Sequence, residues 1–307
     1  MTDSTAGAPV TPGHATATRP GVWLTEGSLV LMAVIWAVNF SVVKYGTSLV
    51  DPLAYNGIRV GLAAVVLALI AGIARAPLPP RSDLVALLAL GALGNGFYQC
   101  LFVIGVSKTS ASDAALVIAA TPAFVAIIGK LRGTERTSTK RGVGIALSIL
   151  GMAFVVLGAT TAAGGNASLT GDLIMLAASL CWATYTVLLK PYTGRIPGMQ
   201  LSALTMVGGA IPLVAYCLPA MRRTDWSAYP PLGWAAVTYS GIGSLVIAYA
   251  FWYRGVRIIG PTRTAMYSNL QPVVAVLVAW ALLSEVPTPM QCIGAASIMG
   301  GLLLSRV

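Results

Sequence analysis

The sequence predicts an all-α membrane protein with ten transmembrane helices, arranged as two inverted five-helix repeats, with the N- and C-termini in the cytoplasm. Three observations predict this fold: an apolar composition, ten long apolar stretches and an internal repeat. Of the 307 residues, 57% are hydrophobic and only 9% are charged, and the mean hydropathy is +0.81. Soluble domains carry roughly 25% charged residues. This composition excludes a soluble enzyme, a nucleic-acid-binding protein and a disordered chain.

The elements follow from the apolar stretches in chain order. Residues 1–26 are rich in Ala, Thr, Pro and Gly, and we expect them to form a disordered cytoplasmic tail. A helix needs about 20 apolar residues to cross a bilayer. Stretches that reach or approach this length are residues 28–50, 53–74, 83–106, 111–131, 141–159, 170–190, 199–218, 232–253, 260–284 and 288–305. The breaks between them are short and carry Pro, Gly and charged residues, so no loop is long enough for a soluble domain.

The distribution of basic residues predicts the orientation. If the N-terminus is cytoplasmic and there are ten spans, most of the 19 Lys and Arg residues lie on the cytoplasmic side. The opposite side then carries Lys108, Arg222 and Arg223. Cytoplasmic loops of membrane proteins are enriched in Lys and Arg. The net charge of +10 therefore indicates topology, and no nucleic acid or other acidic partner is needed to explain it.

The chain contains an internal repeat. Residue types recur 150 positions apart, and the first and sixth spans match with a shift of 146, which pairs Trp36 with Trp182. The sequence therefore predicts a first repeat over 27–159 and a second over 170–307. Because each repeat has five helices, an odd number, the second must be inverted relative to the first. Inverted repeats are typical of secondary transporters, whose substrate sites lie near the midplane between the halves. Matches at a spacing of 150 include Gly91/Gly241, Pro122/Pro272, Glu135/Glu285, Gly144/Gly294 and Gly151/Gly301.

From about Ser28 to Val307, the chain resembles EamA-type members of the drug/metabolite transporter superfamily. Within that superfamily it is similar to YddG-type amino-acid exporters. The resemblance implies ten spans, both termini inside, and export of small metabolites. It rests on Ile35-Trp36-Ala37-Val38-Asn39-Phe40, Thr109-Ser110-Ala111-Ser112 before a span with Pro122, Cys181-Trp182-Ala183-Thr184-Tyr185, Gly260-Pro261-Thr262-Arg263, and Pro272 followed by Glu285.

Aromatic and amide residues inside the spans are predicted to line a substrate cavity. An amide at bilayer depth is costly unless it is paired or faces water. Residues three apart share a helix face, as Trp36 and Asn39 do. The alternatives are helix packing, a place in the interfacial belt, and hydrogen bonds between helices. The predicted substrate-binding residues are Trp36, Asn39, Tyr98, Gln99, Trp182, Tyr185, Tyr249 and Asn269.

Prolines and basic residues inside the spans have two interpretations each. Pro122 and Pro272 each remove a backbone hydrogen bond, and they are either hinges for alternating access or static kinks. Lys44 and Lys190 close the first span of each half, and they either snorkel to the interface or contact a substrate carboxylate. Arg59 either snorkels outward or pairs with Asp51.

Small residues at a spacing of four predict close helix contacts. Examples are Gly144-x-x-x-Ser148 and Ala296-x-x-x-Gly300.

No residue pattern indicates catalysis, a metal or another cofactor. The four cysteines have no metal-binding spacing, and the chain lacks a phosphate-binding loop. The acidic residues fall in the tail, loops or span ends, and the one histidine, His14, is in the tail. Proton-coupled pumps use a buried carboxylate or histidine as a relay, so we do not expect simple carboxylate-based proton antiport.

Together these features predict a secondary transporter and not an enzyme. We expect it to act as a multi-pass protein of the bacterial inner (plasma) membrane, with a small-molecule substrate and the lipid bilayer as its partners, no nucleic-acid partner, and a monomer as its functional unit. The expected substrates are amino acids, aromatic or other neutral ones, or related metabolites, carried by alternating access. The alternative is an exporter of amphipathic drugs with the same fold, and a channel is also possible.

Overall fold

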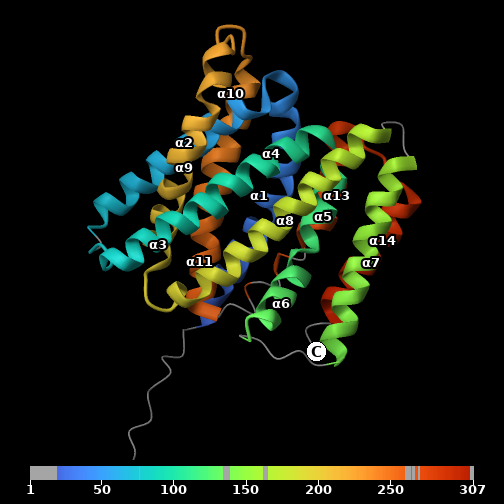
Figure 1. Cartoon of the computed structure of the whole chain (residues 1–307), viewed down its shortest axis with the longest axis horizontal. Helices are drawn as coiled ribbons and strands as arrows, with labels where there is room; N and C mark the ends of the chain where they lie inside the picture. The colour runs from blue at the N-terminus through green and yellow to red at the C-terminus, as the bar shows by residue number, and fades with distance from the viewer. Residues whose placement is uncertain are drawn as a thin grey trace, which may run out of the picture.

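The computed structural model describes residues 19–75, 77–133, 139–161, 165–259, 264, 267–268 and 270–304. Every regular element within these ranges is helical, and together they form one bundle (Figure 1). The elements are α1 (Arg19–Leu49), α2 (Pro52–Ile73), α3 (Arg81–Gly91), η1 (Ala92–Phe97), α4 (Tyr98–Lys108), α5 (Ala111–Ala119), α6 (Thr121–Leu131), α7 (Thr139–Thr161), α8 (Gly165–Thr193), α9 (Gly198–Arg223), α10 (Pro231–Thr238), η2 (Tyr239–Ile247), α11 (Ala248–Ile259), α13 (Leu270–Leu283) and α14 (Pro289–Leu304).

The helices have the length and composition of membrane spans. Within the described ranges, seven helical segments are long and apolar enough to cross a bilayer: α1, α2, α3–η1–α4, α5–α6, α8, α9 and α10–η2–α11. The apolar part of α7 and all of α13 are shorter apolar helices. Many Leu, Val and Ile side chains are exposed around the bundle. An apolar exterior of this extent suits lipid contact, so the expected all-α membrane protein is confirmed in class.

The first helix begins earlier than the sequence predicts. It starts at Arg19, inside the expected tail of residues 1–26, of which residues 1–18 lie outside the described part of the chain. Pro20 falls in its first turn, where a missing backbone N–H costs no intrahelical hydrogen bond. The composition of residues 19–26 therefore does not prevent them from extending the apolar helix.

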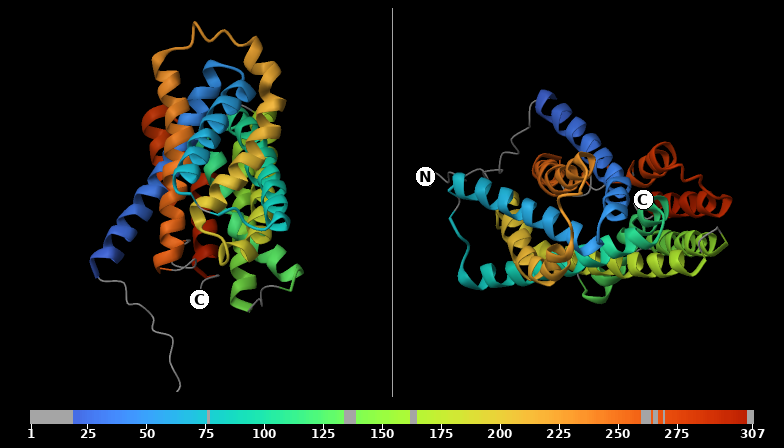
Figure 2. Two further views of the ribbon diagram at one scale, coloured as in Figure 1. Left: turned by 90° about the vertical axis from the view of Figure 1, so that its left-hand side faces the viewer. Right: turned by 90° about the horizontal axis from the view of Figure 1, so that it is seen from above.

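The two ends of the bundle are distinguished by the helix ends and links that lie there. Helix α1 begins and α14 ends at one end, which we call the terminal end (Figure 2). The link between α9 and α10, residues 224–230, lies at the opposite end, which we call the loop end (Figure 1).

The same helix irregularities occur in corresponding places of the chain. The π-helical segments η1 and η2 interrupt the third and the eighth expected spans. Helix α5 ends at Ala119 and α6 begins before Pro122, while α13 begins just before Pro272. At the first break the Thr121 hydroxyl donates to the carbonyl of Ile118 at 2.6 Å, replacing the backbone donor that Pro122 lacks.

Packing between the helices is reciprocal. Helix α2 contacts η2, and its counterpart α9 contacts η1. Helix α1 contacts α11, and its counterpart α8 contacts α4. The pairs α2–α9 and α7–α14 each join a helix to its own counterpart. Reciprocal contacts of this kind are what a two-fold relation between two halves produces.

Close contact of α7 and α14 is made by small residues. A Cβ added to Gly151 would lie 2.7 Å from the carbonyl oxygen of Gly294 and 2.8 Å from the backbone nitrogen of Ile298. The Ser148 hydroxyl donates to the Gly144 carbonyl at 3.0 Å on the same face. On α14 the expected pair Ala296 and Gly300 is wrong. Ala296 is exposed, and a Cβ at Gly300 would touch only Leu147, at 3.7 Å.

Candidate functional site

A continuous group of aromatic rings joins four helices from both halves of the chain. Its members, which we call the central aromatic cluster, are Trp36 of α1, Tyr98 of α4, Trp182 of α8 and Tyr249 of α11. Ring centroids are 4.9 Å apart for Tyr98–Trp182, 6.4 Å for Trp182–Tyr249 and 5.8 Å for Trp36–Tyr249. All four side chains are half-buried. The structure thus brings together four residues that the sequence placed on four separate spans.

The irregular helix η2 holds one of these rings in place. The backbone N–H of Ala248 donates to the carbonyl of Gly243, five residues back, as a π-helix requires. The carbonyl of Ser244 is therefore available, and it accepts the Trp36 indole N–H at 3.0 Å. The π-helical turn thus supplies the polar partner that a buried indole needs.

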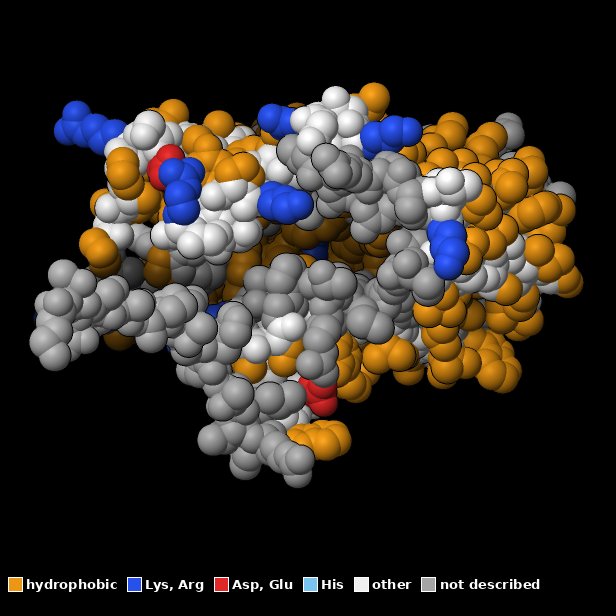
Figure 3. All heavy atoms as spheres, turned by 90° about the horizontal axis from the view of Figure 1, so that it is seen from below, with side chains coloured by type: hydrophobic (Ala, Val, Ile, Leu, Met, Phe, Trp, Pro, Cys, Tyr) orange, Lys and Arg blue, Asp and Glu red, His pale blue; other side chains and the backbone are white. Residues whose placement is uncertain are grey.

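Seen from the terminal end, the surface is hollowed near its middle (Figure 3). Hydrophobic side chains line the hollow, a basic side chain is visible deep inside it, and further Lys and Arg side chains lie along the upper side of the hollow and to its right in this view. A hollow with an apolar wall and few polar groups is the usual form of a small-molecule site.

The other residues predicted for the cavity have different places. Asn39 is buried on α1, and its Oδ1 has no hydrogen-bond partner among the residues that the structure describes. Gln99 is buried on α4 and binds another side chain through its Oε1. Tyr185 is buried against the backbone of η1, with its ring at the position that a side chain on Gly94 would occupy. Asn269 lies outside the described residues.

Arg59 has neither of the two places considered from the sequence. Its side chain is 0% exposed, so it does not snorkel. Asp51 does not pair with it, because that carboxylate caps α2 by accepting from the backbone N–H groups of Leu53 and Ala54. Instead, Arg59 points into the bundle: its Nε donates to Asn56 Oδ1 at 2.9 Å, and its Nη2 donates to Gln99 Oε1 at 2.6 Å. The feature of the sequence that could have indicated this inward position is that Arg59 is a lone charge inside an apolar span.

The two lysines also differ from each other. The Lys44 ammonium donates to the carbonyls of Ser107 at 3.1 Å and Thr109 at 2.5 Å. It therefore satisfies the last carbonyls of α4, a favourable place for a cation at a helix C-terminus. Lys190 is exposed at the end of α8. Neither lysine is part of the central aromatic cluster.

Polar side chains connect different segments of the chain near the loop end. Glu285 accepts from the backbone N–H groups of Ala111 and Ser112 and from the Ser112 hydroxyl, each at 3.0 Å. Gln291 Nε2 donates to Asp113 Oδ1 at 2.6 Å. We call these residues the loop-end clasp. It fastens the start of α5, in the first half, to Glu285 in the link between α13 and α14 and to Gln291 in the first turn of α14, and it places a carboxylate at a helix N-terminus.

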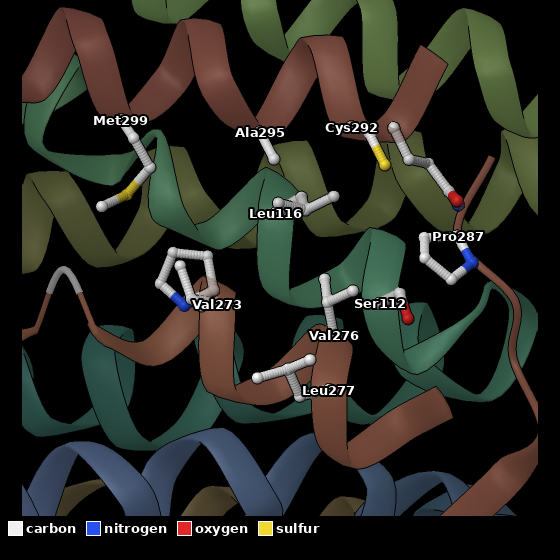
Figure 4. Close-up of a pocket in the computed structure, with 11 residues that line it drawn as sticks. Ser112, Leu116, Val273, Val276, Leu277, Pro287, Cys292, Ala295 and Met299 are labelled. Carbon is white, nitrogen blue, oxygen red and sulfur yellow. The ribbon is translucent and has the colours of Figure 1, made fainter. Parts of the chain in front are cut away.

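A pocket of about 260 Å³ lies elsewhere, between α5, α13 and α14 (Figure 4). Its wall is mostly apolar and includes Leu116, Pro272 and Val276. Val273 and Leu277, which also line it, are more than half exposed, so the pocket opens on the outside of the bundle. Because lipid chains cover such a face in a membrane, this pocket is a poorer candidate for the substrate than the central hollow.

Comparison with known proteins identifies relatives over nearly the whole chain. The model of the EamA-like transporter family matches residues 23–157 and, a second time, residues 169–307. A protein of Streptantibioticus cattleyicolor named "Probable terminal-alkyne amino-acid exporter" is 30% identical over 91% of this chain and 92% of its own. One of Salmonella typhimurium named "Probable amino-acid metabolite efflux pump" is 29% identical, covering 90% and 92%.

Further relatives carry less specific names. A protein of Bacillus subtilis named "Uncharacterized transporter YyaM" is 27% identical over 88% of this chain and 90% of its own. A solved structure titled "Crystal structure of protein" matches with a TM-score of 0.63 and 22% identity, covering 91% of this chain and 96% of that one. This last likeness concerns the fold alone.

Proposed function

This chain belongs to the EamA-like transporter family, and from that premise we propose that it exports amino acids, aromatic or other neutral ones, or related small metabolites. The observation that carries the proposal is the central aromatic cluster, whose half-buried rings come from both halves of the chain. Two relatives named as an amino-acid exporter and an amino-acid metabolite efflux pump support the substrate class. Aromatic rings suit an apolar side chain, and the unpartnered Oδ1 of Asn39 offers an acceptor for a polar end.

We propose ten spans in two inverted repeats, over 27–159 and 170–307. The family model matches twice, and the helix contacts are reciprocal, which supports two related halves. In this topology α7, α13 and α14 complete the ten together with the seven longer segments. We place the terminal end in the cytoplasm of a bacterial cell, because Lys and Arg side chains gather there (Figure 3).

The proposed mechanism is alternating access in a monomer. With the terminal end in the cytoplasm, the hollow admits substrate from inside the cell, and the loop-end clasp closes the outer side. Export then requires the clasp to open while the terminal end closes. The helix breaks at Pro122 and Pro272 are suitable hinges for this movement, since backbone hydrogen bonding is already interrupted there.

The proposal includes no carboxylate relay for protons. Glu285 and Asp113 are engaged by the groups of the clasp near the loop end. A further buried carboxylate, Asp172 near the start of α8, accepts from the hydroxyl of Thr109, which follows the end of α4. We therefore expect export down the gradient of the substrate itself. Substrate flux in liposomes that strictly requires a pH gradient would contradict this part of the proposal.

The test of the proposed function is transport by the purified full chain in liposomes. Exchange of labelled amino acids is compared with that of amphipathic cationic drugs, which represent the alternative substrate class. Trp182→Ala and Tyr249→Ala should lower amino-acid exchange on the order of tenfold, because each removes a wall of the cavity. Trp234→Ala removes an exposed ring of α10 and is the control. Unchanged exchange in both cavity variants, or transport of drugs alone, would refute the proposal.

A further inference from the structure

Arg59 is a buried charge whose hydrogen bonding is incomplete. Two of its three nitrogens donate to amide oxygens, but Nη1 is buried and has no hydrogen-bond partner within the described part of the chain. Among the residues that the structure describes, no carboxylate contacts the guanidinium. A charge inside a membrane protein is expensive unless it is paired, and such residues usually serve a ligand or an ion. Arg59 therefore lacks the one partner that would offset its burial, which is an anion.

The surroundings of the guanidinium hold it in position without neutralising it. Asn56 Oδ1 accepts a hydrogen bond from Arg59 Nε. The Nδ2 of the same asparagine donates to the backbone carbonyl of Gln99 at 3.0 Å. Gln99 Oε1 receives its Nη2. Both acceptors are neutral, so the fork of the guanidinium is oriented while its charge remains available to a ligand.

Arg59 lies next to the proposed substrate cavity. Its Cζ is 5.6 Å from the centroid of the Phe102 ring, whose centroid is 5.8 Å from that of Tyr98 in the central aromatic cluster. The Phe102 ring thus joins the guanidinium to the wall of the cavity through a cation–π contact, and it covers the charge in this conformation.

The charge also distinguishes one half of the protein from the other. With the shift of 146 that relates Trp36 to Trp182, the counterpart of Arg59 is Thr205. The backbone environments correspond: Gly241 of η2 faces the carbonyl of Arg59, and Gly91 faces the carbonyl of Thr205. The hydroxyl of Thr205, however, donates to a carbonyl of its own helix, that of Leu201, at 2.9 Å. The two halves therefore share the backbone packing at this position, but only the first half carries a guanidinium there.

We propose that Arg59 is the carboxylate-binding residue of the substrate site, with Gln99 and Asn56 as positioning residues and the Phe102 ring as a cover that moves aside. The proposal rests on the proposed function. It specifies that a carboxylate is the group recognised, whereas aromatic rings alone would accept amphipathic amines equally well. An arginine fork binds a carboxylate through two parallel charge-assisted hydrogen bonds.

The experiment compares two ligands that differ only in the recognised group, L-phenylalanine and L-phenylalaninamide. Binding of each to the purified full chain in lipid nanodiscs is followed by tryptophan fluorescence, since Trp36 and Trp182 lie in the central aromatic cluster. The wild-type chain should bind the carboxylate at least about tenfold more tightly than the amide. In Arg59→Gln this preference should disappear.

Gln99→Glu is a second variant that does not remove the buried charge. It places a carboxylate at the atom that already accepts from Arg59 Nη2, so the guanidinium gains an internal partner and should release the ligand. The preference for phenylalanine should therefore disappear in a chain that remains folded. Arg222→Gln, which removes an exposed charge at the end of α9, is the matched control and should keep the preference.

The outcomes separate this inference from the proposed function. A wild-type chain that binds both ligands equally, or a preference that persists in Gln99→Glu or in folded Arg59→Gln, overturns the role of Arg59. If exchange of amino acids in liposomes depends on Trp182 and Tyr249 in that case, the proposed function still stands. If the wild-type chain neither binds nor exchanges any amino acid, both fail together.

Discussion

Replacing Gly151 by alanine should destabilise the protein, because the backbones of α7 and α14 meet at this position. The new Cβ would lie 2.7 Å from the Gly294 carbonyl oxygen, 2.8 Å from the Ile298 nitrogen and 2.8 Å from the Ser297 Cβ. Optimal contacts between such atoms are about 3.5 Å or more, so the helices must separate by on the order of 0.7 Å. A gap of this size forfeits roughly a quarter to a half of the dispersion attraction across the interface.

The expected cost is about 1–3 kcal/mol, as for other overpacked interiors. A matched control lies on the same helix: a Cβ at Gly142 would meet nothing within 4 Å. Gly142→Ala should therefore stabilise slightly, by up to about 1 kcal/mol, because alanine has the higher helix propensity. The stability of both variants is measured by thermal unfolding of the purified protein in detergent. The readout is the loss of monodisperse protein on size exclusion. A Tm for Gly151→Ala at or above that of the wild-type chain would refute the argument.

Two further predictions concern movement. Glu285→Gln should weaken the loop-end clasp by about 1 kcal/mol, since neutral hydrogen bonds replace charge-assisted ones, and should increase the population open at that end several-fold. Spin labels attached at positions Lys108 and Val286, in a background with Cys292→Ser, should report longer label-to-label distances in Glu285→Gln than in the chain that keeps Glu285. An unchanged distance distribution would contradict the role of the clasp. Pro122→Ala should restore a backbone donor between α5 and α6, leaving Tm equal or higher while amino-acid exchange in liposomes falls. Pro219→Ala, inside α9, is the control. Undiminished exchange in Pro122→Ala would refute the hinge and show that Pro122 produces only a static kink.

The sequence predicted the helical segments well because the membrane acts on each segment separately. A stretch of about 20 apolar residues is stable across a bilayer whatever its neighbours are, and its polar backbone must then be helical. The expected spans therefore agree with most described helices, and the break between α5 and α6 before Pro122 follows from a missing N–H. Helix ends were misplaced, as at the start of α1, the start of α8 and the end of α9, because a helix can continue through polar residues once an apolar span anchors it.

The direction in which each side chain points was decided by the tertiary structure. Arg59 turns inward because Gln99, on another helix, supplies an acceptor for it, and no local pattern near either residue announces the pair. Lys44 caps α4 through a similar contact between segments far apart in the chain. Tyr185 shares a helix face with Trp182, and their ring centroids are 5.0 Å apart, but Tyr185 is also packed over Gly94 of η1, a contact that no pattern in its own segment announces.

The sequence by itself thus determined the apolar helical segments, and the repeat predicted how they are related. The tertiary structure decided which of their polar and aromatic groups meet. The physical reason is that insertion depends on the transfer energy of one local segment, whereas a site depends on distances between atoms of several segments. The charge of Arg59, ambiguous along the chain, acquires a specific setting only when α2 and α4 are packed together.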